Sequence, residues 1–346
     1  MPRSFRPAPG AAAGILLGLG ASVAGQEPAH VLPGVETSRV VLEARVTDGR
    51  GRPIVDLGPP DFRLEVDGRA VPLESATWVA EAPGAERDRP GGEAPAAVGA
   101  PFPGPGRLVV LLFQKDFEGS RLRGLLRGLR QAKGLVVPLS PRDRVAILTY
   151  DSRLRLHLDF TADQAAVRRT IDESVLLRWP APPEPGPPPS LAAHLGREEA
   201  RDAASPEAAL LALGRALGPI PGAKVVLFFG YGLGELQGPT VVLPPVYDRA
   251  VDALDRARAA VFCLDVTEAE SHSLELGLQR AARDTGGEYL KVHQNPGAAL
   301  DRVAAALAGH YVLAFERPEG RRGDHRVRLA LARRRGSVLT RTRYAD

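Results

Sequence analysis

The sequence has few cysteines and few lysines, and these shortages bear on how the fold is stabilised and on which partners the protein binds. Cysteine occurs once in 346 residues, as Cys263 within the apolar run AAVFCLDV, so the chain forms no disulfide within itself and its fold depends on its core. Lysine occurs four times, so arginine makes up 41 of the 45 basic residues, and 41 acidic residues are interspersed with them. Mixed signs without a basic stripe argue against a nucleic-acid partner.

Long apolar runs are confined to the N-terminus. Arg3 and Arg6 precede the run GAAAGILLGLGASVAG, and Ser22-Val23-Ala24 places small residues before a plausible cleavage point. The pattern predicts a secretory signal peptide over residues 1–25, cleaved near Ala24 to Gly25. The run is shorter than the ~20 residues of a membrane span. We therefore expect a mature chain without a membrane span that is secreted or periplasmic.

The remaining chain divides by composition. Residues 39–80 alternate in the manner of short β-strands and predict a small β module, and residues 81–106 form a linker rich in Pro and Gly. Residues 107–316 alternate between strands and helices and predict an α/β domain. A C-terminal hairpin is expected over residues 324–344. We expect this hairpin to pack with the N-terminal module, because three short strands alone would leave unpaired edges.

The α/β region predicts a mostly parallel sheet with helices on both faces. Its first strand, VVLLF at 109–113, contains only strand-forming apolar residues, as expected of a strand buried on both faces. Two later strands, RVAILTYD and RLRLHLDF, are separated by a few residues and predict one antiparallel edge hairpin. Sheets of this kind bind ligands at the carboxyl ends of their strands.

Several stretches of the sequence resemble a known family. They are VTDGRGRPIVDLGPPDFRLEVDG, PRDRVAILTYDSRLRLHLDFTAD, IPGAKVVLFFGYG, TGGEYL and HYVLAFERPEG, continuing to RTRYAD. They are distributed along the mature chain from residue 46 to residue 346. In this order they resemble the von Willebrand factor A (VWFA) fold and, more closely, the VWFA-related Acidobacterial domain family of secreted bacterial proteins. The resemblance implies a Rossmann-like α/β domain flanked by β elements, with a role in binding rather than catalysis.

Adhesive members of the wider family bind Mg²⁺ through a D-x-S-x-S loop, a Thr and a distant Asp, so the resemblance implies where such a site would lie. Two alignments of the first loop are open. One gives the triplet Gln114, Asp116 and Glu118, and the other gives Asp116, Glu118 and Ser120. The length of the preceding strand favours the first alignment, in which an amide replaces the leading carboxylate.

The other family positions also differ here. Ser205 is the nearest hydroxyl to the expected Thr, and its Ser-Pro-Glu context equally predicts a helix N-cap. Gly230 and Tyr231 stand where metal-binding members carry Asp. Asp265 ends a later strand, so it either replaces a missing carboxylate or caps the next segment. A site with one or two carboxylates lacks the charge that a dedicated Mg²⁺ site needs, so no metal is expected and Asp116 and Glu118 are only weak candidates.

We weigh three functions. The first is a non-enzymatic, extracytoplasmic protein-interaction module with a degenerate metal site, a protein partner and no cofactor. The second is an adhesion domain that depends on a divalent cation held by Asp116, Glu118 and Asp265. The third is a hydrolase that uses the crevice at the strand ends, where His272 is the best-placed histidine, although the chain has no G-x-S-x-G motif. The expected binding residues are Gln114, Asp116, Glu118, Ser120, Ser205, Gly230, Tyr231 and Asp265.

Overall fold

The computed structural model describes residues 39–80, 106–116, 118–136, 142–173, 181, 183–238, 240–293, 296–318 and 322–345. The predicted signal peptide (1–25) and all but the last residue of the predicted linker (81–106) lie outside these residues. Within them, every helix is too short or too polar to pass through a bilayer.

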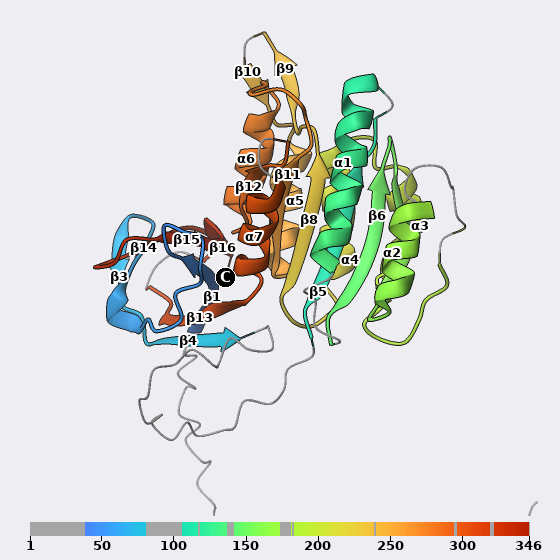
Figure 1. Ribbon diagram of the computed structural model, residues 1–346. Helices are drawn as coiled ribbons and strands as arrows, with labels where there is room; N and C mark the ends of the chain where they lie inside the picture. The colour runs from blue at the N-terminus through green and yellow to red at the C-terminus, as the bar shows by residue number, and fades with distance from the viewer. Residues whose placement is uncertain are drawn as a thin grey trace, which may run out of the picture. The chain divides into compact units, whose positions relative to one another are not determined.

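A six-stranded sheet forms the centre of the α/β region (Figure 1). Five strands are parallel, and the sixth, at one edge, is antiparallel to its neighbour, as the sequence predicts. In spatial order the strands are β12 (Tyr289–Lys291), β11 (Ala259–Asp265), β8 (Lys224–Gly230), β5 (Leu108–Gln114), β6 (Arg144–Tyr150) and β7 (Leu154–Thr161). The strands β5, β8 and β11 are buried along their whole length, which explains why their sequences are apolar on both faces.

Helices cover both faces of this sheet. Alternate residues of β5 enter two separate cores, with Val109 and Leu111 on one side and Val110 and Leu112 on the other. One core includes residues from α1 (Gly119–Val136), α2 (Gln164–Glu173) and α7 (Pro296–Ala306), which lie in front of the sheet in Figure 1. The other includes residues from α3 (Arg197–Arg201), α4 (Pro206–Leu217), α5 (Val246–Arg256) and α6 (Glu275–Asp284). The predicted Rossmann-like α/β fold, a mostly parallel sheet with one antiparallel edge strand and helices on both faces, is confirmed.

The remaining long strands form two antiparallel sheets that share one core. The first sheet has the order β15 (Ser337–Thr340), β1 (Arg39–Thr47), β13 (Gly309–Glu316) and β4 (Ser75–Ala80). The second has the order β16 (Arg343–Ala345), β14 (Asp324–Leu331), β2 (Phe62–Val66) and β3 (Arg69–Val71), and a short 3₁₀ helix (Pro59–Asp61) precedes β2. N-terminal and C-terminal strands thus combine in both sheets. At the centre of their core, the Tyr311 hydroxyl donates to Ile54 O and accepts from Leu57 N, both at 2.9 Å.

Two predicted boundaries differ from the structure. The strand HYVLAFE, expected to end the α/β domain (107–316), is β13 of the first antiparallel sheet. It pairs along six residues with β1 and along six with β4, whereas the edge strand β12 of the central sheet has only three residues to offer a partner. The physical reason is therefore the longer hydrogen-bonded ladder on both sides of β13.

The C-terminal hairpin (324–344) is the second difference. The strands β14 and β15 lie in different sheets, so the connection at residues 332–336, which contains the sequence RRRG, carries the chain from one sheet to the other. The strand β14 pairs instead with β2 and, through Asp324 and Ala345, with β16. Both strands find partners among the N-terminal strands: β14 pairs with all five residues of β2, one more than the four residues of β15 could offer, and β15 pairs along its whole length with β1.

Candidate functional site

The strands β5, β8 and β11 end at the same edge of the central sheet, and the predicted binding residues follow them. Gln114 ends β5 and is buried, and its side-chain oxygen accepts a hydrogen bond from Tyr231 N at 3.0 Å. A Cβ atom on Gly230 would lie 2.8 Å from the same oxygen. The Gln114 amide therefore fills the space that a side chain at position 230 would need.

A guanidinium lies beside the two carboxylates of the loop that follows β5. Arg121, in the first turn of α1, contacts Asp116 at 2.5 Å and Glu118 at 3.4 Å, and it stacks 4.4 Å from the centre of the Tyr231 ring. Partial burial raises the pKa of Asp116, but the N–H of Glu118 and the Arg121 guanidinium outweigh it and hold that pKa below its usual value. Burial and the Asp116 charge raise the pKa of Tyr231.

The glycine-rich loop after β8 packs closely rather than forming an open turn. A Cβ atom on Gly232 would lie 2.5 Å from the Leu274 side chain. Gly234 has φ +86°, and the loop then enters a short hairpin of β9 (Glu235–Gln237) and β10 (Thr240–Val242), which the sequence did not predict. These two glycines therefore serve packing and backbone geometry at this edge.

Ser205 is a helix N-cap, the second of the two roles that its sequence context allows. Its side chain accepts from Ala208 N at 3.1 Å at the start of α4. The next acidic residue, Glu207, is buried and accepts from Gly234 N at 2.6 Å, so it anchors the glycine-rich loop. Burial, with Tyr231 and Glu207 nearby, raises the pKa of Tyr150 to about 12.

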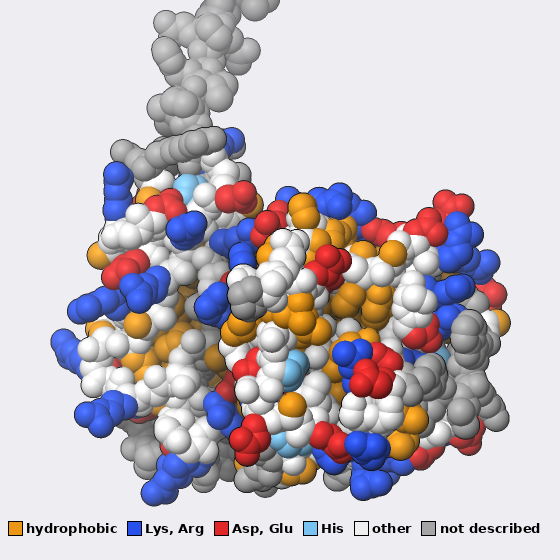
Figure 2. Space-filling view, turned by 90° about the horizontal axis from the view of Figure 1, so that it is seen from above, with side chains coloured by type: hydrophobic (Ala, Val, Ile, Leu, Met, Phe, Trp, Pro, Cys, Tyr) orange, Lys and Arg blue, Asp and Glu red, His pale blue; other side chains and the backbone are white. Residues whose placement is uncertain are grey.

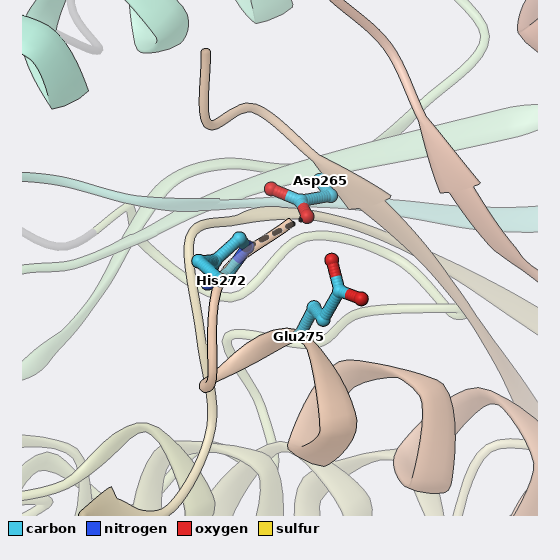
Figure 3. Close-up of side chains that lie close together, drawn as sticks. All are labelled: Asp265, His272 and Glu275. Carbon is cyan, nitrogen blue, oxygen red and sulfur yellow. Dashed lines mark hydrogen bonds and ion pairs between the residues drawn. The ribbon is translucent and has the colours of Figure 1, made fainter. Parts of the chain in front are cut away.

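Asp265 belongs to a separate network at the end of β11 (Figure 3). One carboxylate oxygen accepts from Thr267 N and Oγ1 at 2.9 and 2.6 Å. The other lies 2.8 Å from His272 Nε2 and accepts from the Tyr289 hydroxyl at 2.6 Å. Asp265 therefore caps the following segment and orients His272, and none of these contacts links it to Asp116.

Gln114, Asp116 and Ser205, three of the residues at the metal position that the sequence resemblance implies, already have protein partners. A hard cation takes six or more oxygen ligands, and carboxylates supply most of its charge balance. Here Gln114 is engaged by Tyr231 N, Ser205 by its own helix, and Asp116 by a guanidinium. The positive charge that the carboxylates need is already supplied by Arg121.

A second group of side chains has the geometry of a possible metal site. Asp265, His272 and Glu275 place ligand atoms within 4.8 Å of one another, the geometry that a metal ion would require (Figure 3). The Lys291 ammonium, however, lies 2.9 Å from Glu275, and Tyr289 donates to Asp265. A cation bound there would have to displace an ammonium and a hydroxyl donor. The polar atoms of this group therefore already have protein partners.

Apolar side chains are exposed beside the candidate site. Leu236 on β9 and Leu276 on α6 are each 55% exposed, and Val242 on β10 is 39% exposed. Seen from above, the molecule shows apolar patches between charged side chains on this face (Figure 2). Exposed aliphatic groups near a tyrosine and an arginine are typical of a protein-binding surface.

A polar cluster lies where β5 and β6 end and includes residues of the edge strand β7. Lys115 is buried with Asp151 at 3.4 Å, and Arg155 contacts Asp151 at 3.1 Å. The hydroxyl of Thr149 lies 2.8 Å from His157 Nε2. Burial, with the charges of Lys115 and Arg155, lowers the pKa of His157 to about 4.

The His157 environment predicts a dependence of stability on pH. The unfolded chain takes up this proton below about 6.5 and the folded chain only near 4, so the stabilisation present above pH 6.5 is lost as the pH falls to 4. Between pH 7 and pH 5 we expect this residue alone to lower the free energy of unfolding by about 2 kcal/mol. Urea unfolding at both pH values, compared with His157→Gln, measures it. An equal loss in the variant would show that other groups cause the dependence.

The structure brings together some predicted residues and separates others. Gln114, Asp116, Glu118, Gly230 and Tyr231 form one cluster. Ser120 is exposed, and Ser205 and Asp265 serve other contacts. Sequence reasoning missed Arg121, although a basic residue in the first turn of a helix opposes the helix dipole and is a signal that it has another partner.

Comparison with known proteins adds fold-level similarity only. No protein-family model matches the chain, and no curated protein matches its sequence. Among solved structures, a von Willebrand factor type A protein from Catenulispora acidiphila is 10% identical, with a TM-score of 0.43 over 84% of this chain and 74% of that one. An aerotolerance-related membrane protein from Bacteroides fragilis (15% identical, TM-score 0.39) and BatB from Bacteroides thetaiotaomicron (14%, 0.37) each match 58% of this chain and 98% of their own.

Proposed function

We propose that this protein is a non-enzymatic, extracytoplasmic protein-interaction module whose binding surface is the strand-end edge and needs no metal. One observation carries the proposal: Arg121 bridges Asp116 and Glu118 and stacks on Tyr231. The loop that holds a cation in adhesive relatives is thereby closed by a side chain. The extracytoplasmic location rests on the signal peptide expected from the sequence.

The surface has the composition of an interface. Tyrosine and arginine carry much of the energy at protein interfaces, and exposed aliphatic residues supply the surrounding apolar area. Tyr231 and Arg121 form such a pair, and Leu236, Val242 and Leu276 are exposed nearby. We propose that the partner presents an apolar patch to the β9–β10 hairpin and packs against the Arg121–Tyr231 pair.

Because the proposed binding surface needs no metal, divalent cations should not change the thermal stability of the protein. In thermal unfolding, the midpoint with excess Mg²⁺, Mn²⁺ or Ca²⁺ should equal the midpoint in EDTA to within about 1 °C, since only a ligand bound by the folded state stabilises it. A rise of several degrees with Mg²⁺ that Asp116→Ala abolishes would support the cation-dependent alternative and contradict this proposal.

The binding surface predicts which substitutions weaken partner capture. Tyr231→Ala and Arg121→Ala should each reduce capture from a periplasmic or cell-surface extract at least tenfold, the loss of roughly 1.4 kcal/mol or more expected at an interface anchor. Glu118→Ala is expected to have a smaller effect, because that side chain is exposed. The control is Arg283→Ala, an exposed arginine near the end of α6. Equal capture by Tyr231→Ala would place the surface elsewhere.

The geometry around Asp265 supports a non-enzymatic role. In a Ser-His-Asp arrangement the histidine lies between the nucleophile and the carboxylate. Here the carboxylate of Asp265 lies between the Thr267 hydroxyl and His272, so the histidine is not placed to take the proton of that hydroxyl. The hydrolase alternative predicts turnover that Asp265→Asn abolishes.

A further inference from the structure

A cavity of about 410 Å³ lies at the start of strand β11, whereas the strand-end surface lies at the other end of that strand. Its wall includes Ala259 and Ala260, the first residues of β11, whereas the candidate site follows the last residue of that strand. The rest of the wall comes from β1, from the end of α5 and the residues that follow it, from the loop after α6, and from the C-terminal strands. The cavity therefore has no residue in common with the proposed partner surface.

Arg45 is the unusual residue of this cavity. Residues Leu42, Ala44 and Val46 of β1 point into the core of the antiparallel sheets, so Val41, Glu43 and Arg45 share the other face. Glu43 pairs with Arg258. Arg45 is only 3% exposed, and no carboxylate or carbonyl of the described chain bonds its guanidinium. Its Nε is buried without a hydrogen-bond partner, and its Cζ lies 5.9 Å from the centre of the Phe262 ring.

A second guanidinium lines the same cavity. Arg341 donates to Val41 O at 2.8 Å, but its Nε is also buried and has no hydrogen-bond partner. The nearby acid Asp255 does not fully balance these charges, because burial raises its pKa to about 7 despite Arg341 and Arg343. Buried charges in proteins are paired, so two unsatisfied guanidinium donors in one cavity point to an anionic ligand.

We propose that this cavity binds a small organic monocarboxylate, held by Arg45 and Arg341. Arg presents planar donors that match a carboxylate. The apolar wall, which includes Val41, Ala260 and Tyr344, suits the organic part of such a ligand. The cavity also holds acids, with Asp324 and Asp255 among its lining, which favours a single negative charge over the double charge of a phosphate.

The test uses the full mature chain with 4-bromobenzoate, butyrate and inorganic phosphate as probes. Titration calorimetry should detect the two carboxylates and not phosphate. Arg45→Met should weaken carboxylate binding about 10- to 100-fold, the effect of losing a charge-assisted hydrogen bond. Arg39→Met is the matched control on the same strand, because that residue is exposed and pairs with Glu74 outside the cavity. Equal binding by wild type and Arg45→Met, or tighter binding of phosphate, would overturn the proposal.

A second measurement does not depend on the variant folding. Crystals of the wild-type chain soaked in 4-bromobenzoate should show an anomalous bromine peak in the cavity, with the carboxylate between Arg45 and Arg341. A bromine peak only elsewhere would overturn the proposal. The unliganded Arg45→Met chain should unfold at or above the wild-type temperature, since an apolar side chain of similar length removes a buried charge. A marked drop would show that Arg45 instead stabilises the unliganded fold.

Discussion

A chain that ends at Phe315 is expected to lose most of the stability of its antiparallel sheets. The truncation removes β14, β15 and β16, which pair with β2 and β1. It also removes the buried side chains of Val327, Leu329 and Tyr344, whose burial is worth roughly 5 to 9 kcal/mol together. That loss is comparable to the whole stability of a typical domain.

Tryptophan fluorescence during urea unfolding measures this effect. Trp78 lies on β4, 5.1 Å from Tyr311 in the core of these sheets, and the chain has only one other tryptophan, at position 179. A Trp179→Phe background therefore isolates Trp78. A chain that ends at Tyr344 keeps the buried side chains and is the control, expected to unfold with the full-length midpoint. If the chain ending at Phe315 also kept that midpoint, the C-terminal strands would contribute nothing to the fold.

The second large effect is expected at a buried ion pair at the start of the α/β region. The Asp143 carboxylate accepts from Arg107 N and Nε at 2.9 and 3.0 Å and also contacts Nη2, and Arg107 Nη1 donates to Leu307 O at 2.6 Å. The Asp143 side chain is fully buried. We expect Asp143→Ala to lower the free energy of unfolding by about 3 to 5 kcal/mol, because it leaves a buried guanidinium unpaired.

Urea unfolding of three variants separates this cause from others. Glu74→Ala breaks the exposed Arg39–Glu74 pair and should cost less than about 1 kcal/mol. The double variant Arg107→Met and Asp143→Leu removes both charges and should recover most of the loss. A change below 1 kcal/mol in Asp143→Ala, or no recovery in the double variant, would contradict the argument.

The fold of the α/β region followed from local pattern. Strands such as β5 are apolar on every residue and alternate with helices of regular length, so a parallel sheet covered on both faces was predictable. The sheet to which each peripheral strand belongs could not be predicted from the sequence. The sequence of β13 fits either the central sheet or an antiparallel one, and only the length of the available ladders separates them.

Some features of the candidate site could likewise be predicted from the sequence, and others could not. That an amide and a glycine, Gln114 and Gly230, end the strands β5 and β8 is visible in the sequence, and so is the small number of carboxylates at this edge. That Arg121 closes the site, with its stack on Tyr231, depends on the path of the chain between β5 and α1. The β9–β10 hairpin was not predicted, because its strands have three residues each, and so few residues show no recognisable alternation of apolar and polar side chains.

The sequence by itself determined the α/β class, the position of the strand-end edge and the residue types that stand there, because each depends on residue type and local spacing. Tertiary structure decided which side chain pairs with Asp116 and Glu118, which sheet each terminal strand joins, and where Arg45 and Arg341 meet. Those outcomes depend on contacts between residues up to 300 positions apart, such as Arg341 with Val41. No local pattern encodes such contacts, since their energy comes from burial and pairing in the folded chain.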